Sequence, residues 1–235
     1  MINPIYVSID TTEISVAQVL AQRLSGSVGG IKLGLEFFMA QGPEGIRQVS
    51  TGGLPLFIDV KLHDIPNTVA GAMRGLIRLA PSIVTIHAAG GAEMIKAAVD
   101  AAHSESTKLG VVPPRIVAVT VLTSLDQSAL SAIGVQKPVV DQVVALAKLA
   151  LDAGADGVVC SPHEVSAIRE ALGTKPFLVV PGIRPVGSDV GDQKRVMTPA
   201  QAVEAGADIL VIGRPITQSP DPVAAAEAIF RDLKA

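Results

Sequence analysis

The sequence predicts an α/β fold, a single (β/α)8 (TIM) barrel over residues 1–235, and three observations lead to this prediction. Eight short runs of β-branched and apolar residues alternate with alanine-rich amphipathic stretches along the chain. The apolar runs are nearly continuous, as expected of parallel strands that are covered on both faces. Polar residues gather just after these runs, where the carboxyl ends of barrel strands form the active-site face.

The predicted elements alternate regularly, and glycine, proline or polar residues bound most of them. The strands are expected at residues 6–10, 30–33, 56–62, 83–87, 115–120, 157–160, 177–180 and 209–212. The helices are expected at residues 15–24, 42–50, 69–79, 91–103, 139–153, 165–171, 199–205 and 222–233. Eight strands that are each followed by a helix favour a closed barrel. The alternative is a doubly wound open sheet, which usually has fewer βα units in this length.

Two segments of the chain resemble each other and support this count of elements. Residues 152–159 and 204–211 both read as the end of a helix, a glycine C-cap and a strand. Residues 198–201 have the pattern of a capping box with proline at the first helical position, which predicts a helix start. No linker or low-complexity run interrupts the chain, so we expect one domain.

Composition excludes several classes of protein. The 235 residues are 49% hydrophobic, which suits one α/β domain with a large core. A net charge of −3 and 3% aromatic residues argue against a nucleic-acid partner. No run approaches the roughly 18 apolar residues that span a bilayer, and the first residues lack the regions of a signal peptide. Cys160 is the sole cysteine, so we expect a cytoplasmic protein in which it is a buried hydrophobe.

The third predicted strand carries charges where core residues are expected. Side chains alternate along a strand, so Ile58, Val60 and Leu62 share one apolar face. Asp59 and Lys61 share the opposite face, which points into the barrel. Charges that point inward are costly to desolvate, and this favours a chemical role. The alternative is a structural ion pair on a solvated strand face.

The ends of the other strands also carry polar residues. These residues are Asp10, Lys32, His87, Thr123, Arg184, Gly213 and Arg214. The Gly213–Arg214 pair follows strand eight, where barrels of this kind often bind phosphate through backbone N–H groups and a forked guanidinium. The longest polar connection spans residues 181–195, and Arg184 and Gln193 are candidates to fold over a phosphate. A plain surface loop is the alternative.

The pattern Asp59-x-Lys61-x-x-Asp64-Ile65-x-x-Thr68 resembles the signature of the orotidine 5′-phosphate decarboxylase family in its bacterial form. Further matches lie at residues 9–10, 32–34, 121–124, 180–185, 192–195 and 213–216, so the resemblance covers nearly the whole chain. The extended pattern is specific. The shorter Asp-x-Lys-x-x-Asp core is shared with sugar-phosphate decarboxylases and synthases of the same barrel superfamily.

The resemblance implies an activity and a set of residues. The reaction is the decarboxylation of orotidine 5′-phosphate to uridine 5′-phosphate and CO2, the last step of de novo UMP biosynthesis, without a cofactor or a metal. The implied catalytic residues are Lys32, Asp59, Lys61 and Asp64, with Lys61 stabilising the C6 carbanion and donating the proton. The implied substrate-binding residues are Asp10, Lys32, Asp59, Lys61, Asp64, Ile65, Thr68, Thr123, Arg184, Gln193, Gly213 and Arg214. The resemblance also implies a homodimer, with Asp64 and Thr68 contributed across the interface.

Other interpretations stay open at this point. His63 and His87 are expected to form hydrogen bonds at the barrel rim rather than to act as acid or base. A metal site from Asp59, Asp64 and His87 is an alternative, although Lys61 would compete with a cation there. The first rival function is a metal-dependent decarboxylase or aldol-type synthase for a sugar phosphate. The second is a catalytically silent barrel that binds a phosphometabolite.

Overall fold

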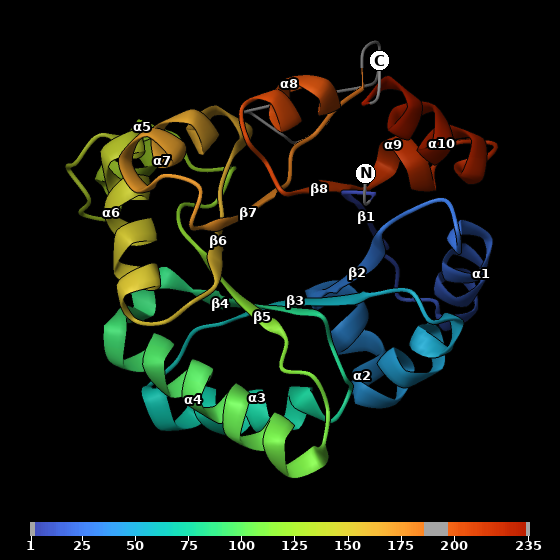
Figure 1. Ribbon diagram of the computed structural model, residues 1–235, viewed down its shortest axis with the longest axis horizontal. Helices are drawn as coiled ribbons and strands as arrows, with labels where there is room; N and C mark the ends of the chain where they lie inside the picture. Colours follow the sequence, from blue (N-terminus) through green and yellow to red (C-terminus); the bar gives the residue numbers. More distant parts are fainter. Residues whose placement is uncertain (1–2, 186–196, 234–235) are drawn as a thin grey trace.

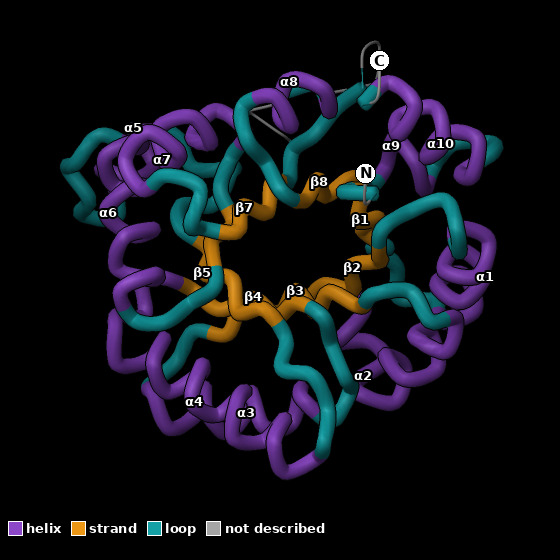
Figure 2. The backbone as a smooth tube through the Cα atoms, in the orientation of Figure 1, coloured by secondary structure: helices purple, strands orange, loops and turns teal. Residues whose placement is uncertain are grey.

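Eight parallel strands form a closed barrel in chain order in the computed structural model, which describes residues 3–185 and 197–233. The strands are β1 Ile5–Ser8, β2 Gly30–Gly34, β3 Leu56–Leu62, β4 Ile83–His87, β5 Arg115–Val119, β6 Gly157–Val159, β7 Phe177–Val180 and β8 Ile209–Ile212. Figure 2 shows them as an inner ring. The predicted (β/α)8 barrel is therefore confirmed.

Helices surround this ring (Figure 1). They are α1 Ile14–Leu24, α2 Leu35–Val49, α3 Pro66–Ile77, α4 Gly91–Leu109, α5 Gln127–Ala132, α6 Val139–Asp152, α7 Val165–Leu172, α8 Pro199–Glu204, α9 Arg214–Thr217 and α10 Pro222–Asp232. Short 3-10 turns lie at Ser50–Gly52, Ala88–Gly90 and Pro162–Glu164. Within the described ranges, no helix is both long and apolar enough to cross a bilayer.

Some boundaries differ from the prediction for identifiable reasons. The first strand ends at Ser8, so Asp10 lies in the loop that follows it. Helix α2 begins at Leu35 rather than at residue 42, because a kink at Gly42 joins two helical segments and the prediction found only the second. Helices α5 and α9 were not predicted, since four to six residues are too few to display a helical period.

The repeated corner between helix and strand is confirmed. Gly154 and Gly206 have φ angles of 98° and 109°, the left-handed region that a glycine C-cap uses. The carboxylate two residues later, Asp156 or Asp208, accepts a 2.7 Å hydrogen bond from a backbone N–H of the preceding strand of the barrel. Thr198 caps α8 in the predicted capping box. These bonds fix where β6 and β8 enter the barrel.

The interior of the barrel has an apolar layer, which we call the floor. It consists of the buried residues Tyr6, Phe57, Ile83, Val117, Val179, Ile209 and Val211. The rings of Tyr6 and Phe57 meet edge to face with centroids 6.5 Å apart. At the amino ends of the strands, the Arg115 guanidinium lies 4.5 Å from the centroid of the Phe177 ring. The floor therefore separates the carboxyl end of the barrel from its amino end.

Candidate active site

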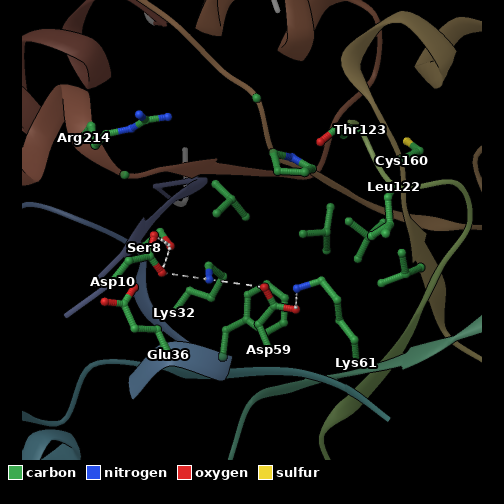
Figure 3. Close-up of a pocket in the computed structure, with 18 of the residues that line it drawn as sticks. Ser8, Asp10, Lys32, Glu36, Asp59, Lys61, Leu122, Thr123, Cys160 and Arg214 are labelled. Atoms are coloured by element: carbon green, nitrogen blue, oxygen red, sulfur yellow. Dashed lines mark hydrogen bonds and ion pairs between the residues drawn. The ribbon is translucent and has the colours of Figure 1, made fainter. Parts of the chain in front are cut away.

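A pocket of about 520 Å³ opens at the carboxyl ends of the strands (Figure 3). Most of the residues predicted for the site line it, namely Asp10, Lys32, Asp59, Lys61, Thr123, Arg184, Gly213 and Arg214. They come from segments spread between the first and last strands of the barrel. The pocket is thus formed by the side chains that follow or end the strands, as expected for this architecture.

Four side chains of alternating sign form a continuous series along one side of the pocket, which we call the charge chain: Asp10, Lys32, Asp59 and Lys61. Lys32 Nζ lies 3.5 Å from Asp10 Oδ1 and 3.2 Å from Asp59 Oδ2. Lys61 Nζ donates a 2.9 Å hydrogen bond to Asp59 Oδ1. Figure 3 shows the series as dashed lines. Both oxygens of Asp59 are therefore paired with ammonium groups.

Burial differs along the charge chain. The side chains of Lys32 and Asp59 are 10% and 12% exposed, whereas that of Lys61 is 31% exposed. Burial alone raises the pKa of Asp59, but the charges of Lys32 and Lys61 and the hydrogen bonds that Asp59 accepts outweigh burial and hold the pKa below its usual value. Asp59 is therefore ionised at neutral pH. Of the two lysines beside it, Lys61 has the more exposed side chain.

Two small residues help to position the charge chain. A Cβ atom added to Gly34 would lie 2.9 Å from Lys32 Nζ, so glycine leaves the room that this ammonium needs. The Ser8 hydroxyl lies 2.9 and 2.8 Å from the two carboxylate oxygens of Asp10. Sequence reasoning missed Ser8. Ser8 could have been predicted, because it is two residues before Asp10 in the predicted strand and therefore lies on the same face.

Strand β3 departs from regular pairing at the charge chain. Ile58 pairs with Val84 and Leu62 pairs with Ile86, so three residues of β3 lie opposite a single residue of β4. Lys61, within this bulge, has a φ angle of 49°. The predicted strand and the placement of Asp59 and Lys61 toward the barrel interior are confirmed, but the bulge was not predicted from the sequence.

The single residue of β4 opposite the bulge is Thr85, which is fully buried. Its hydroxyl accepts a 2.9 Å hydrogen bond from the backbone N–H of Lys61 and donates a 3.0 Å hydrogen bond to Asp59 Oδ1. Sequence reasoning missed Thr85, because its partners depend on the bulge and no sequence pattern marked the bulge.

Two arginine side chains, from the segments that follow β7 and β8, also line the pocket. Figure 3 shows Arg214 across the pocket from Lys61. Strand β8 ends just before Gly213, and α9 begins at Arg214. Arg184 is 9% exposed, and its guanidinium donates a 2.9 Å hydrogen bond to the carbonyl of Ile183. Gln193, which the sequence analysis assigned to the same phosphate site, lies outside the described residues.

Three predicted residues lie outside the pocket. Asp64, Ile65 and Thr68 are exposed, and Ile65 keeps 67% of its surface accessible. Asp64 Oδ1 accepts a 2.7 Å hydrogen bond from the N–H of Ile65, and Asp64 pairs with no cation in the described part of its own chain. Asp64 and Thr68 line a second pocket of about 310 Å³, which Lys61 also borders. Within one chain, the charge chain therefore includes Asp10, next to Lys32, and does not include Asp64, the fourth catalytic residue that the resemblance implies.

The two histidines form a pair. The rings of His63 and His87 stack with centroids 5.0 Å apart, and His87 Nδ1 is buried without a hydrogen-bond partner among the described residues. The described residues therefore supply no hydrogen bond to His87 Nδ1, and the hydrogen bonds expected of His63 stay a prediction. Burial lowers the pKa of His87, and the nearby charges of His63 and Lys61 lower it further. His87 is thus neutral at neutral pH.

The metal alternative finds no support in the geometry of its own residues. In residues 3–185 and 197–233, no three His, Cys, Asp or Glu side chains are grouped as metal ligands. The structure therefore does not bring Asp59, Asp64 and His87 together as a ligand set. Both oxygens of Asp59 already face ammonium groups.

Apolar side chains complete the pocket wall. Val121, Leu122 and Pro181, which belong to the matched segments 121–124 and 180–185, line the pocket. Sequence reasoning did not single out the apolar lining residues Phe57, Val119, Val159, Val179 and Val211, nor the polar Glu36 and Gln218. Several of these are inward residues of the strands, and the alternation rule would have found them had it been applied to each strand. Cys160 also lines the wall and is 1% exposed, so the expectation that it is buried is confirmed.

Comparisons with known proteins identify the family. The model of the orotidine 5′-phosphate decarboxylase / HUMPS family matches residues 3–229. An orotidine 5′-phosphate decarboxylase of Paramagnetospirillum magneticum is 61% identical over 99% of both chains, and one of Rhodospirillum rubrum is 54% identical over 98% of this chain and 94% of that protein. The crystal structure of orotidine 5′-phosphate decarboxylase from Lactobacillus acidophilus is 37% identical, covers 99% of this chain and all of that one, and aligns with a TM-score of 0.86. The chain therefore belongs to the orotidine 5′-phosphate decarboxylase / HUMPS family.

Proposed function

We propose that this carboxy-lyase converts orotidine 5′-phosphate to uridine 5′-phosphate and CO2 without a metal or an organic cofactor, as the last step of de novo UMP synthesis. One observation carries the proposal. The charge chain ends at Lys61, in a pocket that has Arg214 on its other side. A nucleotide with a reacting base at one end and a phosphate at the other matches this separation of charges.

The reaction needs a stabilised carbanion. Decarboxylation leaves an electron pair on a ring carbon that has no adjacent carbonyl to delocalise it. A fixed cation beside this carbon stabilises the developing charge and can then supply the proton. Lys61 fits both roles, because its ammonium is held at 2.9 Å by Asp59 and yet is partly open to the pocket.

Repulsion between Asp59 and the substrate carboxylate makes only a minor contribution. Two like charges about 4 Å apart interact by roughly 4 kcal/mol at an effective dielectric near 20. Enzymes commonly lower barriers by about 8–23 kcal/mol. The preorganised field of Lys61 must therefore supply more than ground-state repulsion does. Asp59 also holds Lys61 in place, which is a separate contribution.

The phosphate end supplies binding energy away from the chemistry. In this proposal Arg184, Gln193, Gly213 and Arg214 hold the phosphate. Their contacts stabilise the complex in which the substrate carboxylate lies against Asp59, so remote binding energy contributes to the rate. Asp10 and Lys32 bind the ribose hydroxyls, and Thr123 contacts the pyrimidine edge.

We also propose a cytoplasmic homodimer in which Asp64 and Thr68 complete the partner subunit's active site. Exposure of the apolar Ile65 supports this, as does an Asp64 carboxylate without a cation in the described part of its own chain. The test is to mix Asp64→Ala protein with Lys61→Ala protein under conditions of subunit exchange. Random pairing should restore about a quarter of wild-type activity, because half of the dimers regain one intact site. No recovery despite exchange would rule out shared sites.

The direct test of the function is an assay without added cofactor. Purified protein is treated with a chelator and mixed with orotidine 5′-phosphate, and the fall in ultraviolet absorbance is followed. We expect full activity before and after chelation. Activity that disappears with the chelator and returns with Mg²⁺ would favour the metal-dependent synthase or decarboxylase of a sugar phosphate. Binding of nucleotide without turnover would favour the silent barrel.

A further inference from the structure

We infer that Thr85 is a positioning residue for the reaction, because its hydroxyl ties the backbone of Lys61 to the carboxylate of Asp59. This inference rests on the proposed role of Lys61 as proton donor. Thr85 does not line the pocket and has no exposed surface, so it acts through these two residues rather than on the substrate.

The direction of both hydrogen bonds is fixed by chemistry. The backbone N–H of Lys61 can only donate, and an ionised carboxylate can only accept. The hydroxyl of Thr85 therefore accepts from Lys61 at 2.9 Å and gives its one proton to Asp59 Oδ1 at 3.0 Å. Lys61 Nζ donates to the same oxygen at 2.9 Å. Backbone, hydroxyl, carboxylate and ammonium thus form a closed ring that starts and ends at Lys61.

The bulge makes this ring necessary. Three residues of β3 lie opposite Thr85 alone, so regular pairing cannot supply a partner for each backbone group. Lys61 also has a φ angle of 49°, which is unfavourable for a residue with a Cβ atom. The Thr85 hydroxyl accepts the hydrogen bond from the Lys61 N–H that regular strand pairing does not provide. This bond stabilises the left-handed backbone conformation of Lys61.

The ring predicts which kinetic constant changes. Without the hydroxyl, the Lys61 backbone is free to relax and the Asp59 carboxylate loses one of its donors. The ammonium then shifts relative to the reacting carbon, while the phosphate contacts on the far side of the pocket are untouched. Loss of positioning should therefore lower kcat and leave KM nearly unchanged.

The experiment compares Thr85→Val, which keeps the shape but removes the hydroxyl, with Thr85→Ser, which keeps the hydroxyl. We expect kcat to fall by about 10- to 100-fold in T85V, and T85S to recover most of the loss. The matched control is Thr120→Val. Thr120 is 2% exposed just after the next strand, β5, and its hydroxyl donates a 3.0 Å hydrogen bond to the Val159 carbonyl, its only partner among the described residues. T120V should lose comparable stability and keep kcat. Unchanged kcat in T85V, or an equal loss in T85V and T85S, would overturn the inference.

A second measurement covers the case in which T85V does not fold. Hydrogen exchange of the Lys61 amide is followed by NMR in the wild type and in T85S. The inference requires a protected amide in both, and rapid exchange in the wild type would contradict it. Exchange does not depend on turnover. A wild-type protein with a protected Lys61 amide and no decarboxylation of orotidine 5′-phosphate would therefore refute the proposed function while leaving the hydrogen bond of Thr85 intact.

Discussion

The floor and the charge chain meet on β3, where they lie two residues apart, yet they have opposite character. On β3, Phe57 belongs to the floor and Asp59 to the charge chain, and both point into the barrel. On β4, Ile83 belongs to the floor and Thr85 bonds the charge chain. Phe57 and Ile83 are regularly paired, whereas Asp59 and Lys61 lie in the bulge of β3, so backbone pairing and side-chain chemistry both differ between the two levels. One layer of the barrel stabilises the fold, and the next carries the charges of the site.

The difference has an energetic consequence. Burial of apolar side chains is favourable, whereas burial of charges is often neutral or unfavourable even when the charges are paired. The charge chain lies directly above an apolar layer, where its field is screened less than in water. Substitutions in the floor should therefore reduce stability, and substitutions in the charge chain should reduce turnover.

The largest expected effect is that of Lys61→Ala. Turnover should be abolished, because the pocket loses the cation that stabilises and protonates the carbanion. Asp59 keeps Lys32 at 3.2 Å, so the protein should stay folded and bind a product analogue within about tenfold of wild type. Kinetics and calorimetric titration measure the two quantities. Substantial residual turnover would rule out Lys61 as the donor.

The next effect concerns the other side of the pocket. We expect Arg214→Ala to lower kcat/KM for orotidine 5′-phosphate by at least about 100-fold, because a charge-assisted contact with the phosphate is lost. Orotidine, which lacks the phosphate, should react with both proteins at similar rates. Parallel assays with the two substrates provide the control. An equal loss on both substrates would refute a phosphate role.

Ile83→Ala tests the floor. Ile83 is 2% exposed and does not line the pocket. Its truncation should lower the free energy of unfolding by about 2–5 kcal/mol, through lost burial and a residual cavity. The rate per folded molecule should be unchanged. Urea unfolding measures the stability, and active-site titration gives the rate per folded molecule. A large fall in kcat without a fall in stability would contradict the assignment of a purely structural role to the floor.

The smallest effect is a pH dependence at the rim. The folded-state pKa of His87 is below its usual 6.5, so the unfolded chain binds more protons in the window below that pH. Stability is therefore fully present above about pH 6.5 and declines as the pH falls toward the folded-state pKa. Unfolding of wild type and His87→Gln should show a smaller decline in the variant. Identical pH dependence would exclude His87 as the cause.

The sequence predicted most of this site because the barrel places strand ends together. Asp10, Lys32, Asp59 and Lys61 could be assigned from strand alternation and the family resemblance. The bulge in β3 could not, because it arises from how two strands pair and no local pattern encodes it. Thr85 depends on that bulge and was missed for the same reason. The roles of Asp64, Ile65 and Thr68, and the assignment of residues 1–235 to one domain, remain predictions.

The most direct test of the central claim is a crystal structure with uridine 5′-phosphate bound. Lys61 Nζ should lie about 3–3.5 Å from C6 of the base, the range of a near-attack geometry, with the phosphate at Arg214 on the other side of the pocket. A base that is well ordered in the pocket but has C6 far from Lys61 Nζ would contradict the account.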